Sequence, residues 1–213
     1  MAEGKYKHII AHPGDVLPVT GINVKVITSD GSVIDHALPG AGEKNEYCSI
    51  AENRPLDRSE NPHSLGVLIT FVKLRILDLG DLTWDKELQL MCPDNRIGHV
   101  DILVVSHHGL YLSSTHALVD GLHPRVAIMN NGATKGGDPR TIDLVRQSPG
   151  LEALWQLHYS DRGGEAHNTE RKYIANLDDP DAGNYLLLTA RNDGSFDIFN
   201  PRDKATVSYA VKH

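Results

Sequence analysis

The feature that most constrains the fold is a series of short apolar runs separated by segments with helical spacing. Residues 100–105 form a near-continuous apolar run, and residues 65–71 and 74–79 form a predicted strand pair. A run of this kind predicts a β-strand that is covered on both faces, because either face would otherwise expose apolar side chains to water. Alternation of such strands with helices predicts an α/β protein with a mixed sheet and flanking helices.

The other segments fit the same alternation. Asp30-Gly31 predicts a hairpin turn, and Asn192-Asp193-Gly194 predicts a second hairpin that closes the fold. Residues 35–63 are polar and rich in turn residues, which predicts a long loop. No repeat or linker is present, so residues 1–213 are predicted to form one domain. The expected strands are 22–28, 32–34, 65–71, 74–79, 100–105, 125–129, 154–159, 185–190 and 195–199, and the expected helices are 84–91, 115–122 and 139–147.

Two of the apolar runs end in residue types that bind metals. Residues 76–79 lead into Gly80-Asp81, and residues 102–105 lead into Ser106-His107-His108-Gly109. Strand ends are where an α/β sheet presents catalytic groups. A carboxylate with imidazoles suits a divalent metal ion. The alternative is structural: Asp81 would cap the helix that starts near Thr83, and the two histidines would be loop residues.

The two motifs resemble the later metal motifs of the metallo-β-lactamase superfamily. The most similar subtype is the metallo-hydrolase domain of bacterial DNA-uptake channel proteins and their soluble relatives. Asn61-Pro62-His63-Ser64-Leu65 resembles that subtype's approach to the Gly-Asp strand, and residues 127–132 resemble its next strand. The resemblance covers roughly residues 14–200. It implies that Asp81 bridges two metal ions and that His108 is a terminal ligand.

One signature of the superfamily is absent from the sequence. The family's His-x-His-x-Asp-His motif precedes the other motifs, but residues 1–36 contain only His8, His12 and His36, without that spacing. We therefore expect residues 1–213 to form half of an αββα metallo-β-lactamase-like sandwich. The N-terminal half of the family fold, which carries the main ligand cluster of the first metal, is expected to be missing.

Asp81 and His108 alone make too small a ligand set. Catalytic zinc generally takes three protein ligands and keeps one position open. The candidates for the missing ligands are residues of a second subunit or His107, His63, His158 and His167. The resemblance implies a divalent metal, with zinc preferred and manganese or iron as alternatives. The predicted catalytic residues are Asp81, His108 and His158.

A second polar cluster lies downstream in the chain. His158 ends the predicted strand at 154–159, and His167 and Asn168 follow a pair of glycines. In the family, side chains at such positions line the substrate mouth, so the resemblance implies that His167, Asn168 and Asn131 bind substrate. The alternative is that His158 is a hydrogen-bonded core residue and that Asn168 is the N-cap of the next helix.

Charge and composition narrow the class of protein. The net charge of −7 argues against a general nucleic-acid-binding surface. The sequence contains no run of about 18 apolar residues and does not open with a signal peptide, so we expect a soluble protein with no membrane partner, of undetermined location. Cys48 and Cys92 form a disulfide if the protein matures in an oxidising compartment, and are otherwise two unrelated thiols. Residues 178–183 could chelate calcium but lack the downstream Glu of an EF-hand loop, so they are predicted to form a solvated turn.

Three functions are consistent with these features. The favoured one is a metal-dependent hydrolase that acts on phosphoesters through a metal-activated water. The second is a catalytically inactive or truncated half-fold that serves as an interaction module, and the third is a metal-binding protein without turnover. A lone half-fold would leave an apolar sheet face and an unpaired strand edge, so a homodimer is also predicted. The strands predicted to need a cover on both faces contain Leu68, Ile76, Leu103 and Val105.

Overall fold

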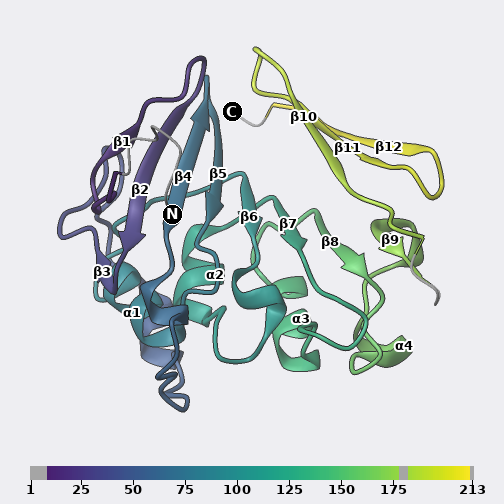
Figure 1. The fold of residues 1–213 in the computed structure, drawn as a ribbon, viewed down its shortest axis with the longest axis horizontal. Helices are drawn as coiled ribbons and strands as arrows, with labels where there is room; N and C mark the ends of the chain where they lie inside the picture. The colour runs from purple at the N-terminus through teal and green to yellow at the C-terminus, as the bar shows by residue number, and fades with distance from the viewer. Residues whose placement is uncertain (1–8, 178–181, 212–213) are drawn as a thin grey trace, which may run out of the picture.

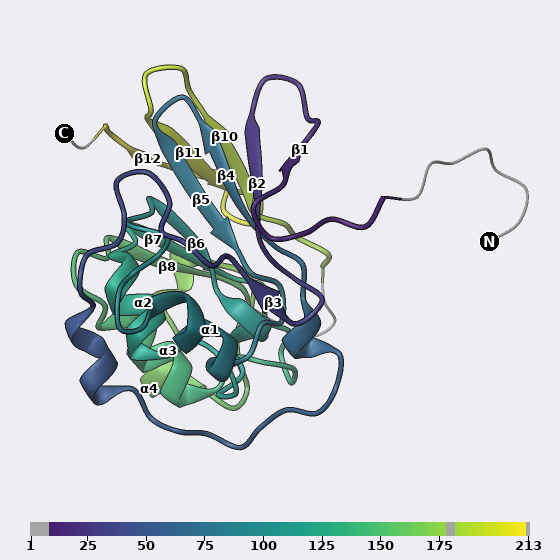
Figure 2. The ribbon, with the colours of Figure 1, turned by 90° about the vertical axis from the view of Figure 1, so that its left-hand side faces the viewer.

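The computed structural model describes residues 9–177 and 182–211, so the acidic run at 178–181 lies outside the described residues. These residues form an α/β fold around a mixed nine-stranded sheet. Helices cover one face of the sheet, and a small antiparallel sheet packs on the other (Figures 1 and 2). The predicted α/β class, with a mixed sheet and flanking helices, is confirmed.

The large sheet has an antiparallel part and a parallel part. Its order is β1-β2-β4-β5-β6-β7-β8-β9, with β3 beside β2, and the pairing is parallel from β5 to β9. The carboxyl ends of these five strands therefore meet at one edge. The strands are β1 (Val16–Leu17), β2 (Asn23–Ser29), β3 (Ser32–Val33), β4 (Gly66–Phe71), β5 (Leu74–Asp78), β6 (Ile102–Val104), β7 (Val126–Met129), β8 (Ala153–His158) and β9 (Ile174–Asn176).

The connections carry short helices, and the chain finishes in the small sheet β10-β11-β12. The helices are α1 (Trp84–Met91), α2 (His116–Leu122), α3 (Pro139–Arg146) and α4 (Gly164–His167), with 3-10 turns η1 (Glu46–Ile50), η2 (Asn61–His63), η3 (Ser106–Gly109) and η4 (Arg171–Tyr173). The small sheet consists of β10 (Leu187–Ala190), β11 (Phe196–Asn200) and β12 (Ala205–Tyr209). Within the described residues, no helix is both long and apolar enough to cross a membrane.

The main core forms where a row of aligned side chains meets the helices. Register pairs Leu68 with Leu77, Leu77 with Leu103, Leu103 with Ala127, and Ala127 with Leu154. All five are buried, and they pack against apolar residues of α1, α2 and α3. Alternate strand residues point to the same face, so this row explains why the strands are apolar on the helix side.

The opposite face of β6, β7 and β8 is covered by the small sheet. Ile102, Val126 and Trp155 form a second core with Phe196 of β11 and Tyr209 of β12. The Trp155 Nε1–H donates to the Tyr209 hydroxyl over 2.9 Å. Part of the cover that the apolar strands were predicted to need therefore comes from the chain's own C-terminal segment.

Several predictions differ from the structure in detail. Four residues were named from the strands that were expected to be covered on both faces. Leu68, Leu103 and Val105 are buried, whereas Ile76 is only partly buried. The predicted loop at 35–63 contains η1 and η2. The elements β1, β9, β12 and α4 were not predicted. β1, β9 and α4 have two, three and four residues, which is too short for a period to be recognised.

Cys48 and Cys92 form a disulfide. It joins η1 to the residue that caps the C-terminus of α1. One of the two alternatives for these cysteines is thereby confirmed.

Candidate functional site

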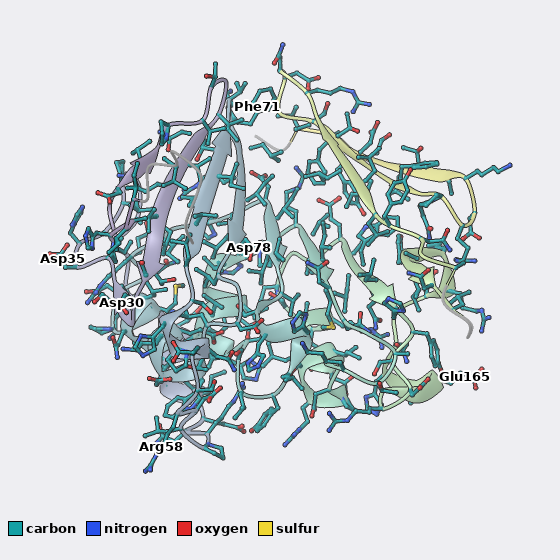
Figure 3. The ribbon with its side chains drawn as sticks, in the orientation of Figure 1. Asp30, Asp35, Arg58, Phe71, Asp78 and Glu165 are labelled. Atoms are coloured by element: carbon teal, nitrogen blue, oxygen red, sulfur yellow. A yellow bond between two sulfur atoms is a disulfide. The ribbon has the colours of Figure 1, made fainter. Side chains whose placement is uncertain are left out.

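Two neighbouring parallel strands deliver the candidate site. Asp78 is the last residue of β5 (Figure 3) and pairs in register with Val104, the last residue of β6. Gly80-Asp81 follows β5, and η3 follows β6 after one residue. The His107 amide donates to the Gly80 carbonyl over 2.9 Å, which ties the two strand exits together.

Asp81 and His108 face each other across these exits. Asp81 Oδ1 lies 3.6 Å from His108 Nε2, and the two side chains are 36% and 31% exposed. The other ring nitrogen of His108 lies 2.9 Å from the Asn130 carbonyl oxygen. A carbonyl only accepts, so Nδ1 carries the proton, and in the neutral ring Nε2 presents a lone pair on the Asp81 side. The separation exceeds a normal hydrogen-bond length, so the two atoms are not hydrogen-bonded to each other.

The backbone at the two histidines is strained. His107 and His108 both adopt the left-handed conformation, with φ of 55° at each. This conformation costs an L-residue on the order of 1–2 kcal/mol. Strain of this kind persists where the surroundings hold the chain in place, and it is concentrated at functional sites.

The loop after β7 provides that support. The Gly137 amide donates to the His108 carbonyl and the Asp138 amide donates to the Gly109 carbonyl, each over 2.9 Å. A Cβ atom on Gly136 would lie 2.0 Å from the His108 carbonyl oxygen, and Gly136 itself has a φ of +74°. Only glycine fits so close an approach in this conformation. Sequence reasoning did not assign this role, although the Gly136-Gly137 pair was a visible signal.

His107 is directed away from the pair and into the protein. The Ser113 hydroxyl donates to the Leu82 carbonyl over 2.6 Å, so it accepts from His107 Nδ1 at 3.2 Å. His107 Nε2 in turn lies 3.2 Å from Asn61 Nδ2 and accepts from it. Burial lowers the pKa of His107, and the nearby Asp81 charge opposes that shift. His107 is thus neutral and engaged at both ring nitrogens, which anchors η3.

His63 also has a partner elsewhere. Its Nδ1 lies 3.3 Å from Asp30 Oδ1, in the turn between β2 and β3, and its side chain is 51% exposed. Among the residues that the structure describes, no group of three or more His, Cys, Asp or Glu side chains is arranged to hold a metal ion. The fold therefore brings together Asp81 and His108, whereas His107 and His63 point to other partners.

The structural alternative, in which Asp81 caps the N-terminus of α1, is wrong. The N-cap of α1 is Thr83, whose hydroxyl donates to Asp85 Oδ1 over 2.7 Å. The Asp81 amide donates to the Ser64 hydroxyl over 3.1 Å. The Asp81 carboxylate is thereby positioned by the end of the η2 segment and not by the helix.

In the downstream cluster, Asn131 and Asn168 hold the backbone together. Asn131 Nδ2 donates to the His158 carbonyl over 2.7 Å. Asn168 is buried, and its Oδ1 accepts from the Ser160 amide over 2.8 Å. Asn168 lies at the C-cap of α4, so the alternative that made it an N-cap is wrong.

His167 lies at the surface between two helices. Its Nδ1 is 2.7 Å from Asp143 Oδ2 on α3, and both side chains are 37% exposed. His158 is the last residue of β8 and pairs with Asn176. Substrate binding by Asn131, His167 and Asn168, and a catalytic role for His158, stay predictions.

No model of a known protein family matches this chain, and no curated protein matches it. The fold and the site describe this chain as an α/β protein with an Asp–His pair at the carboxyl ends of two adjacent parallel strands.

Proposed function

We propose that this chain is a metal-dependent hydrolase of the metallo-β-lactamase type that acts on phosphoesters. The observation that carries the proposal is the 3.6 Å separation of Asp81 Oδ1 and His108 Nε2. Two ligand atoms bound tetrahedrally to one zinc ion lie about 3.4 Å apart, given zinc–ligand distances of about 2.0–2.2 Å. Asp81 Oδ1 and His108 Nε2 are close to that spacing and are not hydrogen-bonded to each other.

The surroundings of His108 support the same proposal. Imidazoles that bind metals almost always donate their other ring N–H to a carbonyl or carboxylate, which fixes the tautomer. His108 makes such a bond to the Asn130 carbonyl. The distribution of layers supports a half-sandwich of the αββα type, because helices cover only one face of the large sheet.

Asp81 and His108 would hold the ion, with zinc preferred over manganese or iron. Bound there, the metal would supply an activated water and polarise the phosphoester oxygen. Two protein ligands are fewer than catalytic zinc uses, so further ligands are required from outside this pair, for which a second subunit is the proposed source. A metal-binding module without turnover is the second candidate, and the two-ligand set favours it.

Metal retention by matched variants tests the proposal. Protein is incubated with Zn²⁺ or Mn²⁺, dialysed and analysed by mass spectrometry for bound metal. We expect Asp81→Ala and His108→Ala to lose bound metal and to lose hydrolysis of bis(p-nitrophenyl) phosphate, with circular dichroism unchanged.

Asp35 and His36 offer a matched control pair. Their side chains also form an Asp–His contact, at 2.6 Å, but are 92% and 71% exposed. Asp35 lies at the edge of the molecule (Figure 3). Asp35→Ala and His36→Ala should keep full metal content. Full metal content in Asp81→Ala would refute the site, and metal binding without hydrolysis would favour the non-catalytic module.

A further inference from the structure

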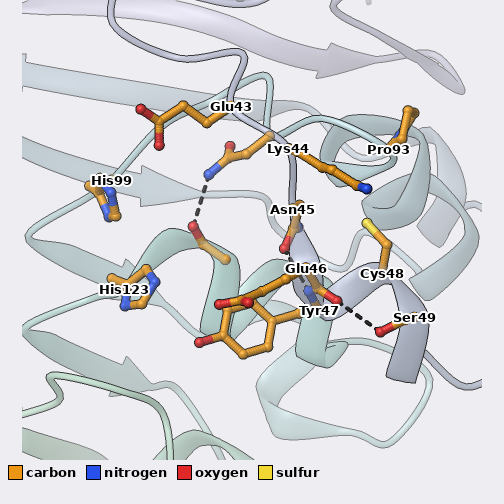
Figure 4. A pocket seen from close by; sticks show the side chains of 12 residues that line it. Glu43, Lys44, Asn45, Glu46, Tyr47, Cys48, Ser49, Pro93, His99 and His123 are labelled. Carbon is orange, nitrogen blue, oxygen red and sulfur yellow. Dashed lines mark hydrogen bonds between the residues drawn. The ribbon is translucent and has the colours of Figure 1, made fainter.

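A cavity of about 670 Å³ lies beside η1, away from the Asp81–His108 pair, and shares no lining residue with it (Figure 4). This volume falls within the range of small-molecule sites. It is open to solvent, and it is formed by segments that are distant in sequence. The lining residues that carry the argument below are Glu43, Glu46, Tyr47, His99 and His123.

Three rings form one wall of the cavity. The ring centroids of His99 and His123 are 5.0 Å apart, and Tyr47 meets His123 edge-on at 6.1 Å. His123 is the C-cap residue of α2 and adopts the left-handed conformation, with a φ of 48°. Glycine is the usual residue at a left-handed helix end, so a histidine there accepts backbone strain and places a ring on the cavity wall.

Two exposed glutamate side chains line the cavity, and the described residues provide neither of them with a partner. The side chains of Glu43 and Glu46 make no hydrogen bond or ion pair with any described residue, and the same holds for the Tyr47 hydroxyl. Figure 4 shows Glu43, Glu46, His99 and His123 around one hollow, with Lys44 pointing to the Pro93 side. Burial raises the pKa of Tyr47, and the charges of Glu46 and Asp120 raise it further.

The wall that carries Tyr47 is held in place independently of any ligand. Asn45 Nδ2 donates to the Met91 carbonyl over 3.0 Å and to the Ala117 carbonyl over 2.8 Å. The disulfide from Cys48 fixes the next turn of η1. A preformed wall lowers the ordering cost of binding.

We propose that this cavity binds a small organic ammonium ion. Glu43 and Glu46 supply attraction to a positive charge, and the Tyr47 ring supplies a cation–π contact. An anion would meet the charges of Glu43 and Glu46, and Lys44, which also lines the cavity, points to the Pro93 side. This site is separate from the proposed metal centre, and its test does not depend on that centre.

The test is a titration followed by nuclear magnetic resonance of the histidine and tyrosine ring signals. The probe is choline, and the matched control is 3,3-dimethylbutan-1-ol, in which carbon replaces the charged nitrogen. We expect choline to shift the ring signals of Tyr47, His99 and His123 with a millimolar dissociation constant, and the alcohol to leave them unchanged. Equal shifts with both probes would show an unselective apolar hollow and overturn the proposal, as would no shift with choline.

Two variants test which side chains contribute to choline binding. Glu46→Gln removes one charge at constant shape, and Tyr47→Leu removes one ring face; each should weaken choline binding by about threefold to fivefold. Glu165→Gln, at the far side of the molecule on α4 (Figure 3), makes the same charge change and should have no effect. Amide spectra confirm that each variant is folded. Unchanged affinity in both cavity variants would refute the assignment.

Discussion

Reduction of the Cys48–Cys92 disulfide should lower the free energy of unfolding by about 4 kcal/mol while leaving the native fold intact. The magnitude follows from the loop that the bond closes, because the two cysteines are 44 positions apart. For a loop of this length, the chain-entropy treatment gives a loss of about 13 cal/mol/K in the unfolded ensemble. At 25 °C this equals about 4 kcal/mol.

The native state should survive reduction because other contacts hold the same segments. Asn45, which caps η1, donates from one side-chain nitrogen to carbonyls at the end of α1 and on α2. Further along the chain, the buried Arg54 guanidinium donates to the carbonyls of Tyr111 and Ser113 over 2.7 and 2.6 Å. Reduction therefore lowers the free energy of unfolding because the unfolded chain gains conformational entropy, and not because native contacts are lost.

Urea denaturation with and without a phosphine reductant measures this difference. Both tryptophans are buried, Trp84 in α1 and Trp155 in the second core, so their fluorescence reports the unfolding of that helix and of that core. The variant in which Cys48 and Cys92 are both serine should match the reduced protein and should not respond to the reductant. A loss below about 1 kcal/mol would refute the entropic reasoning. Loss of native amide signals without urea would show that the disulfide holds η1 in the native state.

Two further substitutions test the supports of the fold and the site. Glu87→Ala removes a buried carboxylate that accepts from the Ser114 and Thr115 amides over 2.7 and 2.8 Å. Each amide left unpaired costs about 1–3 kcal/mol, so urea denaturation should show a free energy of unfolding that is lower by about 2 kcal/mol or more. A loss under about 0.5 kcal/mol would mean that water replaces the carboxylate. Gly136→Ala forces a Cβ against the His108 carbonyl and should reduce metal retention at least as much as His108→Ala, whereas full retention would separate this loop from the site.

Most of the secondary structure was predictable from the chain. The helix at 84–91 was predicted with the limits it has in the structure, and the strands at 65–71 and 74–79 differ from β4 and β5 by one residue at one end. These elements bury one face through a local spacing of apolar residues, so their period is visible in the sequence. By contrast, β9 has three residues and exists because β8 offers its edge. Pairing of that kind is a property of the assembled sheet.

For the candidate site, too, the sequence indicated one part of the chemistry and the tertiary structure decided the other. The sequence alone indicated that a carboxylate and imidazoles follow two neighbouring strands, because strand ends and residue types are both local information. Only the tertiary structure decided which imidazole faces Asp81. The left-handed backbone of η3 turns His108 toward Asp81 and His107 toward Ser113 and Asn61, and Asp30 pairs with His63.

The cavity beside η1 had no signal in the sequence. Its rings come from Tyr47, His99 and His123, which lie on three separate segments, and none of them belongs to a recognisable motif. The sequence of this protein determined most of its strands, its main helices and the residue types at the strand ends, because each depends on the spacing of neighbouring residues. The tertiary structure decided the partners of each side chain, because hydrogen bonds and cavities form between residues that only the packed sheet brings within a few ångströms.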